Sequence, residues 1–255
     1  MFIAQAWQSI MEPHFSAELT LLGMACDLVG GLYLAYDLFG GEKGPLSTIT
    51  RLVNYSLLMI AGFIFPLGPK FALIAGIGLG AAFGLHIDRI GKGKTDTFWF
   101  LLGIGALRAL ALTLALWVVD YKSLALILGP LSLLVSVILP KLKITPAEFY
   151  QSDKKPHLKK AQLIIALVLG GLAAATALVG ASFGGDSLKV AHFGIKLGLT
   201  FAGTVLVVTT LSPMIEWYAD NLPDRSFGFA GAILFMTGFL IQAIPSLVVM
   251  FDIAK

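Results

Sequence analysis

Long apolar runs separated by short polar connections divide the whole sequence. A helix needs about 20 apolar residues to cross a hydrocarbon core about 30 Å thick, and about 17 to 25 are tolerated. Eight segments meet or nearly meet this requirement. They are Leu19–Phe39, Pro45–Phe65, Phe71–Ile87, Thr97–Val119, Ser123–Leu139, Ala161–Phe183, Val190–Leu211 and Phe227–Phe251. The runs therefore predict an all-α, polytopic transmembrane helical bundle of eight spans.

Composition argues against a soluble domain anywhere in the chain. Only 13% of the residues are charged and 57% are hydrophobic, whereas a soluble domain carries about 25% charged residues. The apolar runs leave no stretch long enough for an independent water-soluble domain. We therefore expect residues 1–255 to form a single integral membrane domain, with residues 1–18 as an interfacial N-terminal segment and residues 140–160 as a basic cytoplasmic loop.

The second run, Pro45–Phe65, is the weakest of the eight. Arg51 and Asn54 occupy its first turns, which leaves an apolar core of only about 14 residues. A segment of that length can be re-entrant or strongly tilted instead of crossing the bilayer. The number of spans would then be seven.

Lysine and arginine are distributed unequally between the two sides of the predicted bundle. Twelve lie in the connections that follow the first, third, fifth and seventh spans, and four lie on the opposite side. These four are Lys70, Lys122, Lys189 and Lys255. Cytoplasmic loops carry the excess of basic residues, so both termini are expected on the non-cytoplasmic side. A compact chain without long tails is typical of the inner (plasma) membrane of a prokaryote.

The loop at residues 140–160 contains six lysines. They are expected to meet anionic lipid headgroups, or simply to fix the topology without a specific partner. A nucleic-acid partner is not expected, because the loop lacks interleaved aromatic residues and no domain is available to present it.

Small residues mark two spans as candidates for the centre of the bundle. Gly76, Gly80 and Gly84 recur every four residues in the third span, and Gly170 and Gly171 make a similar surface on the sixth. Small residues at helical spacing let a partner backbone approach closely, which favours helix association in lipid. The partner can be a neighbouring helix of the same chain, a second copy, or another membrane protein.

Three ionisable residues lie deep inside predicted spans, where charge is costly and indicates function by default. Asp27, Lys196 and Arg108 lie about 12, 10 and 16 Å from the non-cytoplasmic ends of their helices at 1.5 Å per residue. Lys189, His192 and Lys196 are spaced three and four apart, so they share one helix side that descends toward this level.

Two interpretations of these residues remain open. In the first, a basic ladder leading to Asp27 and Arg108 binds or passes an anion, or relays protons through His192. In the second, Asp27 pairs with Arg108 or Lys196 to hold helices together while the lysines reach toward the headgroups. Other ionisable residues at span ends, among them His86 and Asp88, are expected at the hydrated interface.

No complete catalytic set is present. Gly180-Ala181-Ser182-Phe183-Gly184 matches the nucleophile-elbow pattern, but the elbow requires a strand-to-helix turn that a membrane helix does not offer. The four histidines lie in four different segments and Cys26 is the single cysteine, so neither a metal nor a cofactor is expected. A transporter or channel for a small ion or anionic solute is favoured. The alternatives are a non-catalytic subunit or scaffold that binds lipid or other membrane proteins, and, least favoured, an intramembrane enzyme.

Overall fold

The computed structural model describes residues 13–41, 44–94, 97–141, 170–171, 174–175, 187–221 and 226–250. Every regular element in these ranges is a helix, which confirms the all-α prediction. The chain divides into two compact units. The first contains residues up to Thr50 and from Asp220 onward, and the second contains Arg51–Ala219.

Six described helices are long and apolar enough to cross a membrane. They are Phe15–Leu38, Ser47–Leu67, Pro69–Gly91, Phe98–Val118, Leu188–Val208 and Ser226–Val248. The fifth predicted span corresponds to the 20-residue helix Lys122–Lys141, in which Lys122–Ser136 is a shorter apolar stretch. The sixth predicted span lies almost entirely outside the described residues, as does the basic loop at residues 140–160 beyond Lys141.

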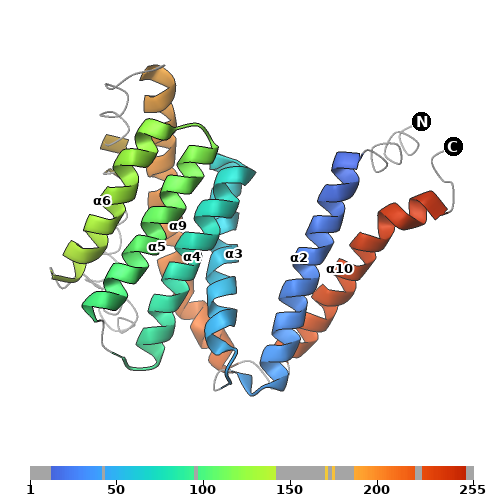
Figure 1. Ribbon diagram of the computed structural model, residues 1–255. Helices are drawn as coiled ribbons and strands as arrows, with labels where there is room; N and C mark the ends of the chain where they lie inside the picture. Colours follow the sequence, from blue (N-terminus) through green and yellow to red (C-terminus); the bar gives the residue numbers. More distant parts are fainter. Residues whose placement is uncertain are drawn as a thin grey trace. The chain divides into compact units, whose positions relative to one another are not determined.

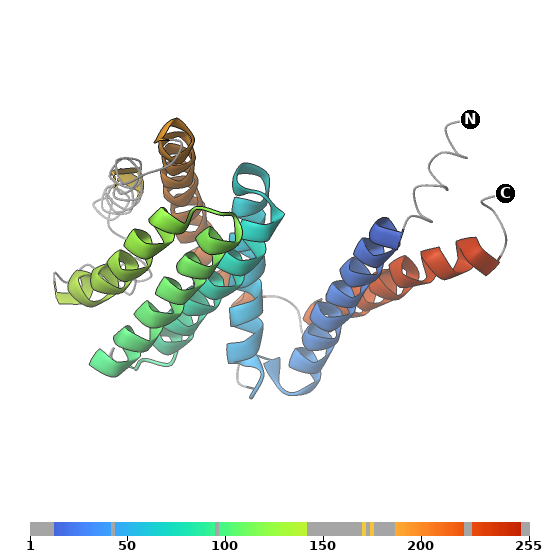
Figure 2. The ribbon, with the colours of Figure 1, turned by 45° about the horizontal axis from the view of Figure 1, so that its top comes forward.

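The first unit is a pair of antiparallel helices that are far apart in the sequence, α2 (Pro13–Leu38) and α10 (Ser226–Met250). We call this pair the hairpin. They lie side by side and run in opposite directions in both ribbon views (Figures 1 and 2). α2 begins at Pro13, a residue favoured in the first helical turn because its missing N–H has no partner there in any case. Residues 13–18, which the sequence assigned to an interfacial segment, thus open α2, and residues 1–12 lie outside the described residues.

Glycines on both helices set the register of the hairpin. Gly23 and Gly30 on α2 are seven residues apart, as are Gly231 and Gly238 on α10. A Cβ added to Gly30 would lie 2.5 Å from the Phe235 backbone nitrogen, and one added to Gly238 would lie 2.6 Å from the Gly23 carbonyl oxygen. Two antiparallel helices therefore meet backbone to backbone at two levels, two turns apart.

The second unit contains five described helices. They are α3 (Ser47–Leu67, of which residues 47–50 belong to the first unit), α4 (Pro69–Gly91), α5 (Phe98–Val118), α6 (Lys122–Lys141) and α9 (Ser187–Asn221). Short turns join α3 to α6 in sequence, so neighbouring helices alternate in direction (Figure 1). Gly68, with a φ of 87°, and Pro69 at the first turn of α4 make the tightest of these turns.

α4 is the central helix of this unit, with 61% of its spanning window buried. Its glycines lie against α3: a Cβ added to Gly76, Gly80 or Gly84 would approach a backbone atom of α3 to 2.9 Å or less. On the neighbouring side Gly78 faces Ala111 of α5. Because these glycines lack side chains, α3 and α5 can approach α4 closely. Close approach of this kind favours the association of helices in lipid.

Gly170 and Gly171, which the sequence treated as a pair, have different surroundings. A Cβ added to Gly170 would lie 2.7 Å from the carbonyl oxygen of Gly198 on α9, whereas one added to Gly171 would meet nothing within 4 Å. Of the two, only Gly170 lies at a close helix contact with α9.

Candidate functional site

An aromatic cluster joins three chain segments at one end of the second unit. Phe193, in the second turn of α9, stacks on Tyr121 at 3.8 Å between ring centroids and meets Phe71 edge to face at 6.4 Å. Tyr121 lies in the turn between α5 and α6, and Phe71 lies in the first turn of α4. The start of α4, the start of α6 and the start of α9 are therefore held together by one side chain.

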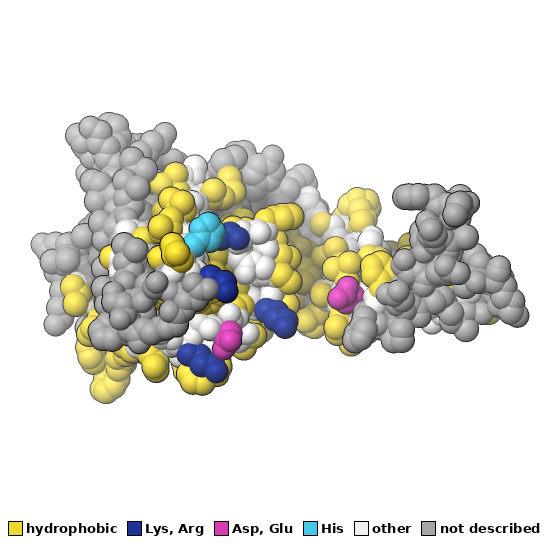
Figure 3. All heavy atoms as spheres, turned by 90° about the horizontal axis from the view of Figure 1, so that it is seen from above, with side chains coloured by type: hydrophobic (Ala, Val, Ile, Leu, Met, Phe, Trp, Pro, Cys, Tyr) yellow, Lys and Arg dark blue, Asp and Glu magenta, His cyan; other side chains and the backbone are white. Residues whose placement is uncertain are grey.

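Each of these segments also carries an exposed lysine close to its aromatic residue. Lys70 precedes Phe71, Lys122 follows Tyr121, and Lys189 lies one helical turn before Phe193, which the exposed His192 directly precedes. We call this set of Lys70, Lys122, Lys189 and His192 the cationic end. Figure 3, which looks down on the structure from this end, shows basic side chains and a histidine gathered over the second unit.

Negative charge is sparse at the cationic end. Asp120 is the acidic residue in the described connections there, and it lies 3.5 Å from Lys122 with its side chain 86% exposed. Its φ of 67° is a left-handed conformation that Asp tolerates in turns. The described part of this end therefore holds three lysines and one acid, and its net charge is positive.

The predicted ladder continues from this end along α9. Lys189, His192 and Lys196 are all exposed, whereas the adjacent Leu197 is completely buried. The spacing of three and four therefore does place the three basic side chains on the open side of the helix. Thr200, one turn further, donates its hydroxyl to the carbonyl of Lys196 at 2.7 Å.

Arg108 lies midway along α5. It shares a helix side with Ile104, Ala111 and Ala115, all of them buried, while Arg108 itself is half-buried. Among the residues that the structure describes, none forms an ion pair or hydrogen bond with its guanidinium. A charge in apolar surroundings without a counter-charge is a costly feature of this helix.

Asp27 belongs to the hairpin unit and has a partner that the sequence reasoning missed. The Nε2 of Gln242 on α10 donates a hydrogen bond to its Oδ2, across the two helices. Gln242 is the only long polar side chain in α10, and this isolation in an apolar run was the available signal. The predicted pairing of Asp27 with Arg108 or Lys196 stays a prediction.

An ion-pair cluster lies at the opposite end of the second unit from the cationic end. Arg51 of α3 donates to Oδ1 of Asp88 at 3.1 Å, and Lys92 donates to Oδ2 of the same carboxylate at 2.7 Å. Asp88 is therefore buried between two cations. This explains how Arg51, which weakened the second predicted span, is accommodated in a continuous 21-residue helix.

The expectation that His86 and Asp88 lie at a hydrated interface is wrong. His86 is only 3% exposed and Asp88 only 7%. The reason is lateral packing: α3 covers Asp88, and the His86 ring stacks at 6.1 Å on Phe100 of α5. The guanidinium of Arg89 lies over the Phe100 ring, 4.2 Å from the ring centroid. The position of these two residues near the end of a helix could not predict that neighbouring helices bury them.

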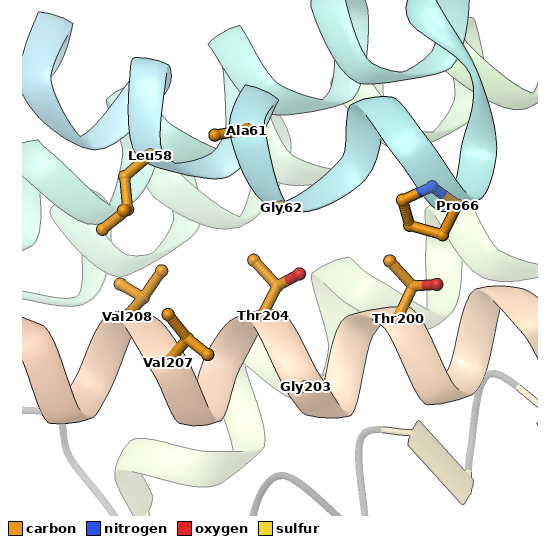
Figure 4. Close-up of a pocket in the computed structure, with 9 residues that line it drawn as sticks. All are labelled: Leu58, Ala61, Gly62, Pro66, Thr200, Gly203, Thr204, Val207 and Val208. Atoms are coloured by element: carbon orange, nitrogen blue, oxygen red, sulfur yellow. The ribbon is translucent and has the colours of Figure 1, made fainter.

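A groove of about 420 Å³ runs between α3 and α9 (Figure 4). Its walls are largely aliphatic, with Leu58, Val207 and Val208 among the lining residues. Thr204 contributes a hydroxyl and packs against Gly62. Since no charged side chain is among its lining residues, the groove does not provide an anion site.

Six helices of membrane-spanning length and apolarity define the class: the chain is a multi-pass integral membrane protein. No protein-family model matches its sequence, and neither a curated protein nor a solved structure matches it.

Proposed function

We propose that the protein is a transporter or channel for a small ion, with an anionic solute as the species bound. The observation that carries this proposal is Arg108, held among buried residues of α5 without a counter-charge among the described residues. A guanidinium offers five donors in a fixed fork that suits carboxylate, phosphate and similar anions. An anion bound there offsets the cost of the lone charge.

The cationic end supports the same proposal as the entrance. Lys70, Lys122 and Lys189 raise the local anion concentration at one end of the second unit, and Lys196 extends the basic side of α9 inward. α5 ends at Val118, beside this surface, so Arg108 lies ten residues, or about 15 Å, further along the helix. Entrance and binding residue are thus parts of one unit.

The orientation of the chain is part of the proposal. With both termini on the non-cytoplasmic side of an inner membrane, the cationic end faces outward and the cluster around Asp88 faces the cytoplasm. The lysines of residues 140–160 would then meet anionic headgroups of the inner leaflet. In this arrangement the protein takes up an anion from outside the cell.

Anion flux into liposomes tests the proposal. Purified protein is reconstituted, and uptake of chloride, phosphate and sulfate is compared between the wild type and Arg108→Gln. Removing charge-assisted hydrogen bonds worth about 1.5 to 3 kcal/mol is expected to weaken apparent affinity about 10- to 100-fold. Lys94→Gln, an exposed lysine after α4 at the other end, is the matched control and is expected to transport normally.

The entrance is tested by the double variant Lys70→Gln/Lys122→Gln. Uptake is expected to fall at low ionic strength and to recover relative to the wild type near 1 M salt, where the screening length is about 3 Å. Unchanged flux in Arg108→Gln, or no flux of any anion in the wild type, contradicts the proposed function.

The second candidate function, a non-catalytic scaffold, is favoured by the hairpin unit. There Asp27 has its partner inside the hairpin and the two helices meet through backbone contacts, as in a dry packing element. Such a protein would bind lipid, a second copy or another membrane protein through its exposed apolar sides. Absence of flux together with co-purification of a defined membrane partner would support this alternative.

A further inference from the structure

The hairpin unit contains one carboxyl group in the middle of its hydrophobic length. Asp27 lies about halfway along α2, and residues 13–38 and 226–250, which form the two helices, contain no lysine or arginine. Gln242 donates to Oδ2, but Oδ1 is buried and has no hydrogen-bond partner in the described part of the structure. One oxygen of this carboxyl group therefore accepts a hydrogen bond, and the other is buried without a donor among the described residues.

A second oxygen acceptor lies beside Oδ1 at the contact with Gly238. Oδ1 and the carbonyl oxygen of Gly23 both face Gly238, where an added Cβ would lie 2.6 Å from the Gly23 oxygen and closer still to Oδ1. Gly23 precedes Asp27 by one helical turn, and its carbonyl has a second lone pair besides the one used by the helix. Two acceptors facing one space are satisfied when one of them carries a proton.

We propose that Asp27 is a proton-binding site within the hairpin, independent of the anion function proposed above. Its carboxyl takes up a proton on Oδ1 and donates it toward the carbonyl of Gly23, while Gln242 fixes Oδ2. The proton supplies Oδ1 with the hydrogen bond that it otherwise lacks in the described part of the structure. Gly238 leaves the space that this arrangement needs, because any side chain there would displace Oδ1.

Neighbouring charges do not supply an alternative within the hairpin. α10 carries no ionisable side chain in residues 226–250. Besides Asp27, the ionisable residues of α2 are His14, Glu18, Cys26, Tyr33, Tyr36 and Asp37. Glu18 and Asp37 lie nine and ten residues from Asp27, which is about 14 to 15 Å along the helix axis. Asp27 therefore binds its proton as a single group and not as a shared pair.

Infrared spectroscopy of the reconstituted full-length protein tests this site. The wild type is expected to show the carbonyl stretch of a neutral carboxylic acid at about pH 7, a band that is absent in Asp27→Asn and unchanged in the control Asp37→Asn. Gln242→Leu is expected to shift the band, since it removes the hydrogen bond to Oδ2. A wild-type spectrum without this band overturns the proposal.

Carbodiimide labelling gives an answer that does not depend on a variant folding. A carboxylic acid O–H adds across one C=N bond of the reagent: the new bond joins Oδ to the central carbon, and the proton moves to nitrogen. A lipid-soluble carbodiimide is expected to modify Asp27, located by mass spectrometry, at about pH 7. Modification of Glu18 and Asp37 without Asp27, or protection of Asp27 by sodium at constant pH, contradicts proton binding. Neither measurement involves transport, so the two proposals fail separately.

Discussion

Two helix pairs in this protein are packed through glycine, but they place their polar groups differently. In the α2–α10 hairpin, glycines on both helices bring backbone against backbone, and a carboxyl–amide pair lies midway along the contact. Between α3 and α4 the glycines are on α4 alone and receive larger residues of α3, such as Ile60, and the ion pair lies at the helix end.

The difference follows from what each pair can bury. Only 17% of the spanning window is buried in α2 and in α10, against 61% in α4. A two-helix hairpin cannot surround a full ion pair, so its single acid is matched with an uncharged amide. α4 lies between α3 and α5, and its Asp88 pairs with two cations, Arg51 of α3 and Lys92 directly after α4. A charge is thus accommodated according to how many helices enclose it.

The largest expected effect comes from breaking the enclosed ion pair. Asp88→Asn removes the buried carboxylate that pairs with Arg51 and Lys92, and we expect unfolding free energy to fall by about 3 to 5 kcal/mol. Asp120→Asn removes an exposed partner of Lys122 and should cost about 0 to 1 kcal/mol. Denaturant titration of both variants measures the difference. Equal losses would show that enclosure does not distinguish these two acids.

The glycine contacts should come next in size. Gly30→Ala places a methyl group 2.5 Å from the Phe235 nitrogen, and such overpacking costs about 1 to 3 kcal/mol. Gly31→Ala, one residue away, meets nothing within 4 Å and should be neutral or stabilising, because alanine favours the helix by up to about 1 kcal/mol. Thermal unfolding of the pair in one detergent checks the hairpin register, and a tolerated Gly30→Ala would contradict it.

The same comparison in the second unit uses Gly80→Ala and Gly103→Ala. The first places a methyl group 2.5 Å from the backbone nitrogen of Ser56, whereas Gly103 has open space within 4 Å. A loss of about 1 to 3 kcal/mol is expected only for Gly80→Ala. If the loss is smaller than that for Gly30→Ala, the backbone of α3 shifts more readily than the backbone of α10.

The smallest expected effect is on the amide of the hairpin. Gln242→Leu removes one hydrogen bond to Asp27, and a single intramolecular hydrogen bond contributes about 0.5 to 1.5 kcal/mol net. Gln242→Met, which keeps the length of the side chain but supplies no amide donor, is the control for packing. A loss above about 3 kcal/mol for Gln242→Leu would indicate that Asp27 is ionised and depends on the amide for its charge.

The existence of the helices could be predicted from the sequence because apolar length alone determines whether a segment can span a bilayer. Even the weak second run is a continuous helix, since Asp88, thirty-seven residues later, neutralises Arg51. The four-residue glycine spacing of α4 was visible for the same reason: it is local. The seven-residue spacing in both α2 and α10 was equally visible but gains meaning only when the two helices are known to pair.

Most of the candidate site depended on contacts that no local pattern contains. Lys70, Lys122 and Lys189 were counted as scattered charges on the sparsely basic side, yet Phe193 gathers their segments at one end. Choice of neighbour in lipid depends on shape and small residues and not on hydrophobic periodicity, so single-sequence reasoning could not find this gathering. The basic side of α9 could be found because it lies within one helix.

Anion-dependent stabilisation of the purified protein tests the central claim, that the lone guanidinium of Arg108 binds an anion. Chloride, phosphate or sulfate replaces gluconate at constant ionic strength while thermal unfolding is followed. Ligand at about 100 times its Kd stabilises the native state by about 2.7 kcal/mol. We predict that the wild type gains this stability with one of the three anions and that Arg108→Gln gains none. An equal gain in both proteins, or none in the wild type, would contradict the account.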